Sequence, residues 1–308
     1  MKDLLKVVNR AVKKNGGVFS YMRIDDGTVE ANNGRIAIRA TVPELDGVTA
    51  TVPGAKLVAA VNACKGDIHV HTTNANLMVK SGSFSARIPL LVNDVPASDY
   101  DEGTPVTVPG DLPVKLATAA GFASEQFNGV LLRGSGIYGV SANAFIELAG
   151  EAVDGDVVIP LDTVADLAAI KELPTGMRVT DNAVIFDYAS FQLRSQKVDK
   201  HWPDVSPFLT FDEDAVPTVP DGCLEAVTSV LPFADPSGQV TFTDGSVTCG
   251  EATVDDIDVA DGTFVGDTLR KALSLSTGFG VYREGDNAEH IRARFIGDGV
   301  RGVLAGRA

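Results

Sequence analysis

The chain has 308 residues, of which 44% are hydrophobic and 22% charged, so it can bury two or three cores rather than one. This composition excludes disorder over most of the length, and no apolar run is long enough for a membrane-spanning helix. The formal net charge of −15 argues against a protein that coats nucleic acid with an evenly charged surface, because phosphate binding needs local positive charge.

The N-terminal third predicts two helices that alternate with two hairpins. The opening segment places apolar residues at helical spacing on one face and basic residues on the other, which is typical of a surface helix. The first hairpin turns at Asp26-Gly27, and Pro53 marks the start of the second helix. We expect a helix over residues 2–14, a hairpin over 22–38, a helix within 51–61 and a hairpin over 77–87.

Similar series of elements follow in the rest of the chain. The middle third predicts a helix over 112–123, a hairpin over 130–148 with its turn near Gly134–Gly136, a helix within 158–168 and a hairpin over 184–194. The last third predicts a helix over 222–233, a hairpin over 240–254 that turns at Asp244-Gly245, and a helix within 264–273. Asp267 lies in the first turn of that helix, where a carboxylate suits the helix dipole.

The repeat has a period of about 107 residues, which identical residues keep in the pairs Pro53/Pro160, Ser83/Ser190, Phe84/Phe191 and Arg87/Arg194. Solenoid repeats run about 20 to 50 residues and cannot bury a core alone, whereas units of about 100 residues can. We therefore expect three domains of one fold at residues 1–103, 104–208 and 209–308. Linkers at 99–105 and 203–214 contain the acidic residues, Pro and Gly expected between domains.

Basic residues gather on the predicted helices of an otherwise acidic chain. A run of charge is usually only a solvated helix face, and no single helix forms a convincing patch. If the domains form an arc with these helices on its concave side, the cations meet on one surface and attract phosphates without reading bases. The candidate DNA-binding residues are Lys2, Lys6, Arg10, Lys13, Lys14, Lys56, Lys65, Lys115, Lys171, Arg270 and Lys271.

Several short motifs resemble those of the bacterial DNA polymerase III beta-subunit sliding clamp. Their order covers essentially the whole chain, and the likeness is to a divergent or phage-encoded form of that family. The motifs are Val52-Pro-Gly-Ala-Lys-Leu57 with the following stretch 77–90, Phe127-Asn-Gly-Val-Leu-Leu132, Val158-Ile-Pro160, and Arg194 through His201-Trp-Pro-Asp204.

The resemblance implies an α+β DNA-clamp fold with three repeated domains, each with two inner helices and outer antiparallel sheets. It implies a head-to-tail homodimer whose six domains form a ring around double-stranded DNA without sequence preference. It also implies that DNA polymerase and the clamp loader insert short linear peptides into a pocket between the second and third domains. Carried over by position, this pocket would involve Phe127, Ala142, Phe145, Pro203, Phe208, Val303 and Leu304.

Three features depart from the family pattern. The sequence reaches its first helix almost at once, so the family's first strand has no counterpart and a sheet edge is left to explain. Residues 140–148 form a longer segment than the family's Ala-Thr-Asp-Gly-His-Arg-Leu, and Gly302–Ala308 lacks the family's Met-Pro-Met. We therefore expect the peptide specificity to differ.

The histidines and cysteines offer little for catalysis. His69 and His71 share a strand face, which is compatible with two metal ligands but fits an exposed strand better. His201 fits packing beside Trp202, and His290 lies among charged residues. The cysteines are odd in number and far apart, so we expect buried side chains rather than disulfides or zinc ligands at Cys64, Cys223 and Cys249.

The remaining motifs also favour a protein without catalytic chemistry. GxSxG, Walker, HExxH and CxxC motifs are missing. The acidic run Asp212–Asp214 fits a solvated connector better than a metal site, and Asp255–Asp256 fits the surface of a hairpin. We expect no enzymatic activity, no cofactor, no metal and no membrane partner. Charged residues near the N-terminus replace the apolar core of a signal peptide, which favours a cytoplasmic location. The alternative is a repeat-built structural or scaffolding protein that shares clamp-like domains but does not encircle DNA.

Overall fold

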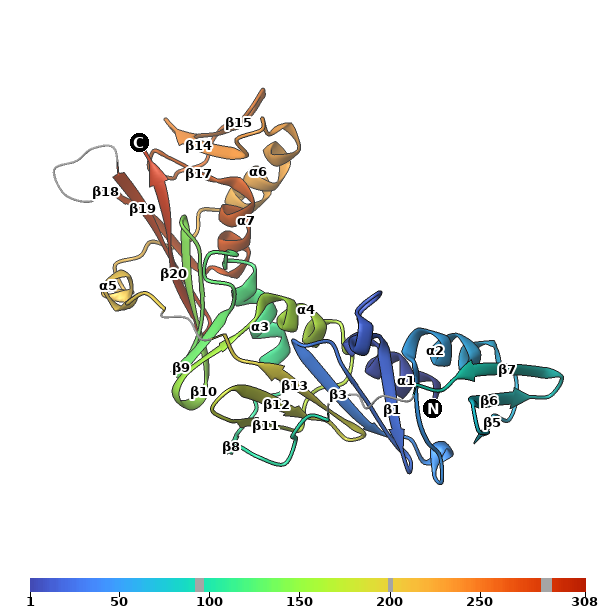
Figure 1. Cartoon of the computed structure of the whole chain (residues 1–308). Helices are drawn as coiled ribbons and strands as arrows, with labels where there is room; N and C mark the ends of the chain where they lie inside the picture. Colours follow the sequence, from blue (N-terminus) through green and yellow to red (C-terminus); the bar gives the residue numbers. More distant parts are fainter. Residues whose placement is uncertain (92–96, 199–201, 284–289) are drawn as a thin grey trace. The chain divides into compact units, whose positions relative to one another are not determined.

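Helices and strands follow one another in the order that the sequence repeat predicts (Figure 1). The computed structural model describes residues 1–91, 97–198, 202–283 and 290–308. It divides into unit 1, formed by Met1–Asp111 and Ala165–Lys197, and unit 2, formed by Leu112–Val164 and Val198–Ala308. The middle repeat therefore contributes strands to both units, and the two predicted boundaries between the three domains remain a prediction.

Unit 1 contains an eight-stranded antiparallel sheet and a three-stranded sheet, with α1 packed against α2. The large sheet has the order β4-β1-β2-β3-β13-β12-β11-β8, and the small one the order β5-β6-β7. Its helices are α1 (Lys2–Val8) and α2 (Gly54–Ala63), and α4 (Leu161–Ala168) spans the boundary between the units. The strands are β1 (Tyr21–Asp25), β2 (Thr28–Asn32), β3 (Ile36–Thr41), β4 (Thr49–Pro53), β5 (His69–Thr72), β6 (Asn76–Ser81), β7 (Phe84–Pro89), β8 (Thr104–Val106), β11 (Gly176–Val179), β12 (Ala183–Asp187) and β13 (Phe191–Gln196).

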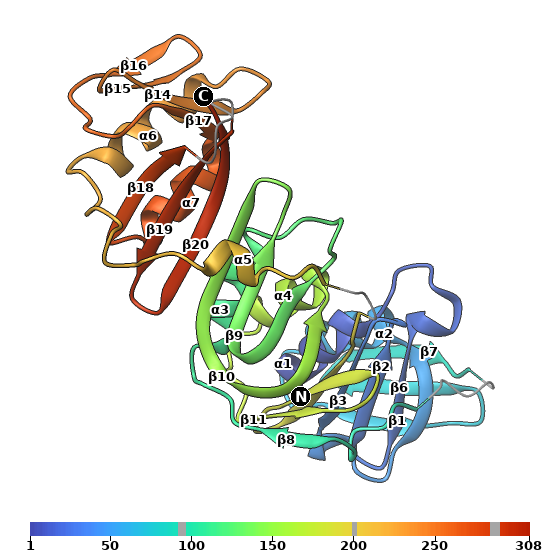
Figure 2. The same ribbon diagram turned by 90° about the vertical axis from the view of Figure 1, so that its left-hand side faces the viewer.

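Unit 2 contains a nine-stranded sheet with the path β16-β15-β14-β17-β20-β10-β9, to which β19 and β18 are added beside β20. Helices α6 and α7 pack together and α7 contacts β19 and β20, while the short α5 lies on the opposite face of those strands (Figure 2). The helices are α3 (Leu112–Ala120), α5 (Ser206–Leu209), α6 (Cys223–Val230) and α7 (Gly266–Leu275). The strands are β9 (Val130–Val140), β10 (Ala144–Ile159), β14 (Gln239–Thr243), β15 (Ser246–Cys249), β16 (Ala252–Val254), β17 (Gly262–Val265), β18 (Gly278–Arg283), β19 (His290–Gly297) and β20 (Val300–Arg307).

The two Asp-Gly turns form where the sequence predicts them. Asp26 and Gly27 have φ of 46° and 77°, and Asp244 and Gly245 have φ of 49° and 77°. Two-residue turns that match the strand twist require positive φ at both central positions, which Asp and Gly tolerate. These turns therefore fix the register of β1 with β2 and of β14 with β15.

The turn predicted near Gly134–Gly136 is wrong. β9 continues through these glycines to Val140, and the chain reverses at residues 141–143 instead. The glycines lie opposite an irregular stretch of β10, where pairing is interrupted between Ala149 and Asp156. Glycine here accommodates a bulge, which the sequence pattern does not distinguish from a turn.

Each unit joins consecutive sequence repeats through one pair of strands. In unit 1, β3 of the first repeat pairs with β13, the last strand of the second, and Ile38 faces Leu193. In unit 2, β10 of the second repeat pairs with β20, the last strand of the third, and Phe145 faces Val303. The same join therefore occurs twice along the chain.

Close packing of helices on the sheets accounts for several small residues. A side chain at Gly139 of β9 would lie 2.0 Å from the carbonyl oxygen of Ala119 in α3, so only glycine permits this approach. Buried apolar side chains fill the space beneath the other helices. The three cysteines, Cys64, Cys223 and Cys249, are free and buried, which confirms the prediction for them.

Candidate nucleic-acid and peptide interfaces

Several predicted DNA-binding cations are exposed, but few of them lie on helices. α1 ends at Val8 and a 3₁₀ turn over Asn9–Ala11 follows, so the predicted helix over residues 2–14 is too long. The backbone N–H of Lys13 donates to the carbonyl of Phe19 at 2.9 Å, which draws the chain away from the helix axis. Five of the predicted lysines are exposed and have no hydrogen-bond or ion-pair partner for their amino groups among the described residues: Lys13, Lys14, Lys56, Lys65 and Lys171.

Three other predicted cations are engaged by helix ends within the chain. The Lys2 amino group donates to the carbonyl of Cys64 after α2 at 2.6 Å, and that of Lys271 donates to the carbonyl of Gly121 after α3 at 3.0 Å. The Arg10 guanidinium donates to the carbonyl of Ala169 after α4 at 3.2 Å. The last carbonyls of a helix lack internal partners and carry partial negative charge, so these cations stabilise helix ends.

The last three predicted cations are partly covered or locally paired. Lys6 is exposed and lies 3.5 Å from Asp3 in the same helix, and Arg270 lies 3.9 Å from Asp267. Lys115 on α3 is half-buried. Such exposed pairs contribute little to stability, so Lys6 and Arg270 stay available to a ligand of higher charge density.

Four of the seven predicted pocket residues line one apolar cavity of about 90 Å³ in unit 2. Ala142 lies in the turn between β9 and β10, Phe145 is in β10, Val303 is opposite it in β20, and Phe208 is in α5. A cavity of this size suits one apolar side chain rather than a drug-sized ligand, whose pockets measure about 300 to 1,000 Å³. The sequence therefore identifies the centre of this cavity.

The other three predicted pocket residues lie outside the cavity lining. Leu304 is 1% exposed and alternates with Val303, so its side chain faces the other side of β20. Phe127 packs against Trp202 with ring centroids 6.0 Å apart, and Pro203 is half-buried beside it. They support the cavity rather than line it, and His201 lies outside the described residues.

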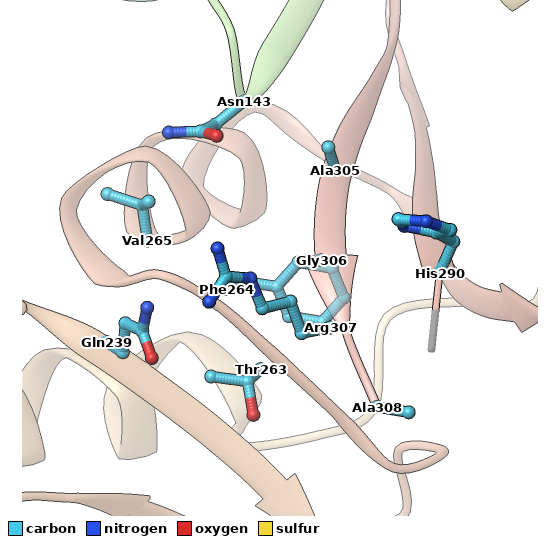
Figure 3. Close-up of a pocket in the computed structure, with 10 residues that line it drawn as sticks. All are labelled: Asn143, Gln239, Thr263, Phe264, Val265, His290, Ala305, Gly306, Arg307 and Ala308. Atoms are coloured by element: carbon cyan, nitrogen blue, oxygen red, sulfur yellow. The ribbon is translucent and has the colours of Figure 1, made fainter. Parts of the chain in front are cut away.

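A wider hollow of about 720 Å³ adjoins the cavity and shares Asn143 and Ala305 with it (Figure 3). It lies between the start of β10, where Ala144 faces Leu304 of β20, and the single pair Thr263 and Arg307 that joins β17 to β20. The two hollows together are called the β20 groove below. Besides those residues, the wider part is lined by Gln239, Phe264, Val265, His290, Gly306 and Ala308.

Two groove residues carry signals that sequence reasoning missed. Ala305 and Arg307 follow Val303 at every second position, and such alternation places side chains on one face of a strand. Arg292 offers no comparable signal, because its place opposite Ala305 depends on the register of β19 with β20. Its guanidinium lies 4.9 Å from the ring centre of Phe208, which positions it at the rim of the cavity.

A charged network fixes the acidic linker near the groove. Arg301 donates to Glu147 of β10 and, at 3.1 Å, to Glu213. The acidic run Asp212–Asp214, predicted to be a solvated connector, is therefore held to β20 through Glu213. The hydroxyl of Tyr138 donates to Glu147 at 2.9 Å. Burial, followed by the bond to Glu147, raises the pKa of Tyr138 to about 12, so this hydroxyl remains a donor at neutral pH.

Solved structures of bacterial DNA polymerase sliding clamps share this fold. The DNA polymerase III beta chain of Streptococcus pneumoniae matches with a TM-score of 0.80 at 15% identity, and the match covers 99% of this chain and 96% of that chain. The fold is that of a bacterial sliding clamp. The sliding clamps of Bacillus subtilis (TM-score 0.79, 14% identity) and C. crescentus (TM-score 0.79, 17% identity) match over the same shares of both chains. The predicted α+β clamp fold is confirmed, and at these identities the likeness extends to the fold.

No protein-family model and no curated protein sequence matches the chain. Among the described residues, no helix is both long and apolar enough to cross a lipid bilayer. His69 and His71 lie exposed on β5 of the clamp fold, and no described group of three or more His, Cys, Asp or Glu side chains is arranged to hold a metal ion.

Proposed function

We propose that the protein is a DNA sliding clamp, a non-catalytic processivity factor that encircles duplex DNA in the cytoplasm and tethers a replicative polymerase. The observation that carries this proposal is the strand join that occurs twice, β3 with β13 and β10 with β20. A join that repeats between consecutive domains can continue into a second chain, and a rotation that closes produces a ring. The predicted domains 1–103, 104–208 and 209–308 would be its segments.

The strands that a third join would use are sheet edges in the single chain. By the order of elements, β16 occupies in the third repeat the place of β3 and β10, and β7 is the last strand of the first repeat. β16 ends the nine-stranded sheet and β7 ends the three-stranded sheet. Pairing of β16 with β7 of a second copy would satisfy both edges and gives a head-to-tail homodimer.

Helix contacts repeat in the same way. Arg10, just after the first helix of repeat one, contacts Asp166 in the second helix of repeat two at 3.8 Å. Gly121, just after the first helix of repeat two, accepts from Lys271 in the second helix of repeat three. The 3₁₀ turn Leu231–Phe233 that follows α6 carries Phe233, which is 60% exposed. We infer that Phe233 contacts α2 of the second copy.

The proposed ring would hold DNA by charge alone. Exposed lysines near α1, α2 and α4 supply long flexible cations, which attract phosphates in any register and read no bases. Polymerase and clamp loader would bind through short linear peptides whose apolar side chain enters the cavity between Phe145, Phe208 and Val303.

Light scattering combined with small-angle X-ray scattering tests the ring. We expect a closed ring of about twice the chain mass of 32.2 kDa. Phe233→Asp should shift the protein toward monomers, because it places a charge in the interface, whereas Leu173→Asp, at a residue that is 52% exposed, should not. A wild-type monomer or an open filament would contradict the clamp and favour the scaffolding alternative.

A further inference from the structure

The outer edge of β5 has no covering segment among the described residues, whereas the corresponding edges of the other two repeats are covered. β5 begins 107 residues before β11, which is the spacing of the sequence repeat. The outer edge of β11 is covered by β8, in which Val106 faces Met177. The outer edge of β18 is covered by the segment before α6, in which Thr218 faces Gly278. β5 pairs with β6 alone in the described part of the chain and lies at the edge of the three-stranded sheet (Figure 1).

The two covering segments share one chemistry. Residues 105–109 read Pro-Val-Thr-Val-Pro, and residues 217–220 read Pro-Thr-Val-Pro. Acidic residues precede both of them, within 99–102 and at 212–214. β-Branched residues favour strands, and proline within a sheet is confined to edges because it has no N–H to donate. The chain therefore covers this kind of edge with an extended segment that combines carboxylates, proline and β-branched residues.

Val70 shows what an added strand would bury on β5. Its counterpart at the repeat spacing is Met177, which faces β8 and is 3% exposed. Val70 faces the fully buried Val79 and so lies on the core side of the small sheet, yet it is only half-buried. A strand added beside β5 would cover Val70 and give partners to main-chain groups that otherwise bond to water.

The solvent-exposed face of the three-stranded sheet is basic. Strands β5, β6 and β7 contain no Asp or Glu, and their ionisable side chains are those of His69, His71, Lys80 and Arg87. Strand register places all four on the same exposed face. The acidic residues nearest in sequence are Asp67, which is exposed before β5, and Asp94, which lies outside the described residues. This face complements an acidic segment, whereas a second copy of β5 would bring the same basic side chains alongside.

We propose that the outer edge of β5 is a docking site for an extended acidic segment of a partner protein, which adds to the small sheet as β8 adds to β11. Main-chain hydrogen bonds provide the affinity, and the basic face selects for carboxylates. In the second repeat, Arg178 lies at the position of His71 and donates to the carbonyl of Glu102, just before β8, at 3.3 Å. The inference goes beyond the proposed clamp function, because β5 belongs neither to the β20 groove nor to the edge at β7 that would pair with a second copy.

Hydrogen–deuterium exchange on the full-length protein tests the added strand. The probe is a synthetic peptide with the chain's own covering sequence of residues 101–109, Asp-Glu-Gly-Thr-Pro-Val-Thr-Val-Pro. Main-chain N–H groups on the open side of an edge strand exchange with solvent, and pairing with a new strand protects them. We expect excess peptide to slow exchange within β5 about fivefold, while exchange in β18, whose edge is already covered, stays unchanged.

Charge variants test the selection for carboxylates by fluorescence anisotropy of the labelled peptide. His71→Glu places a carboxylate beside the acidic segment and should weaken binding about fivefold at low salt. Replacing the Asp and Glu of the peptide by Asn and Gln should weaken its binding to the wild type by a similar factor. Thr243→Glu, at an exposed strand end in unit 2, has the same formal net charge as His71→Glu and should bind the peptide as the wild type does.

The contrary results differ in what they overturn. β5 amides that are protected without peptide at every protein concentration would reveal an edge covered within the chain itself. Protection without peptide that is lost on dilution would identify a second copy as the occupant. Exchange that is fast with and without peptide would contradict docking of this kind of segment. Protection of β5 with equal affinity for both peptides and for His71→Glu would keep the docking edge and overturn the selection for carboxylates.

Discussion

Lys2, Arg10 and Lys271 show how a basic residue on a helix can serve the fold rather than a ligand. Each donates to a carbonyl that follows the C-terminal end of another helix. Sequence reasoning groups them with the exposed lysines, since both kinds of residue lie on the polar face of an amphipathic segment. The partners of Arg10 and Lys271 are more than 100 residues away along the chain, so no local pattern reveals them. A neighbouring helix end decides the role of such a cation.

Arg10→Gln should lower the free energy of unfolding by about 1 kcal/mol, because it removes the charge that bonds the end of α4 and faces Asp166. Lys6→Gln provides the matched control on the exposed side of α1, where the lysine pairs with Asp3 of the same helix. Urea unfolding followed by circular dichroism measures both variants. Equal stability of the two variants would contradict the capping role.

At the scale of elements, a polar ladder crosses the strand join of unit 1. Arg178 of β11 donates to Asp187 of β12 at 2.8 Å, and Gln192 of β13 donates to the same carboxylate at 2.7 Å. Arg39 of β3 then donates to the side-chain oxygen of Gln192 at 2.7 Å. The ladder therefore ties the first repeat to the second on the polar face of the sheet. Cross-strand polar pairs of this kind stabilise a sheet and fix its register.

Because the ladder contains a carboxylate, the stability of the protein should depend on pH in the acid range. Hydrogen bonding to Arg178 lowers the pKa of Asp187 below its usual value of about 3.8. A lowered pKa means that the stabilisation is present above about pH 3.8 and is lost as pH falls through the folded-state pKa. Asp187→Asn should be less stable than the wild type by about 1 kcal/mol at pH 7.

The difference in stability should shrink below pH 3.8, where the wild-type carboxyl becomes protonated. Thermal unfolding of wild type and Asp187→Asn across the acid range measures this convergence. Asp25→Asn, at an exposed residue that pairs with Arg23 on its own strand, is the control for removing one surface carboxylate. A gap between wild type and Asp187→Asn that is constant with pH would contradict the assignment.

Hairpins were predictable from the sequence where an Asp-Gly pair forms the turn. They were not predictable where glycines lie beside a β-bulge. Asp26-Gly27 and Asp244-Gly245 turn as predicted, because few residue pairs accept positive φ twice. The Gly134–Gly136 segment continues as strand, since its irregularity belongs to the partner strand β10. The cavity around Val303 was identified by family resemblance. Arg292 was not, because its place depends on pairing between β19 and β20.

At the scale of the whole molecule, the acidic net charge and the proposed DNA contact are compatible only if charge is segregated. The chain has a formal charge of −15, so a duplex is repelled by most of its surface. Exposed lysines around the helices are the exception, and three of them with no competing helix-end contact are Lys6, Lys14 and Lys56. If the acidic residues lie on the outside of the proposed ring and these lysines on its inside, a duplex threaded through the ring would be favoured over DNA bound to the outer surface.

Charge reversal tests this segregation when the variant and its control have the same net charge. The triple variant Lys6→Glu, Lys14→Glu, Lys56→Glu should bind a short labelled duplex at least tenfold more weakly and reduce the slope of log affinity against log salt by about 2 to 3, since each phosphate contact contributes nearly one unit. The control reverses Lys80, Lys197 and Arg283, which lie on or beside strands β6, β13 and β18. It carries the same net charge and should bind the duplex as the wild type does. If both variants lose affinity equally, general repulsion explains the loss and the lysines near α1 and α2 have no special place in DNA binding.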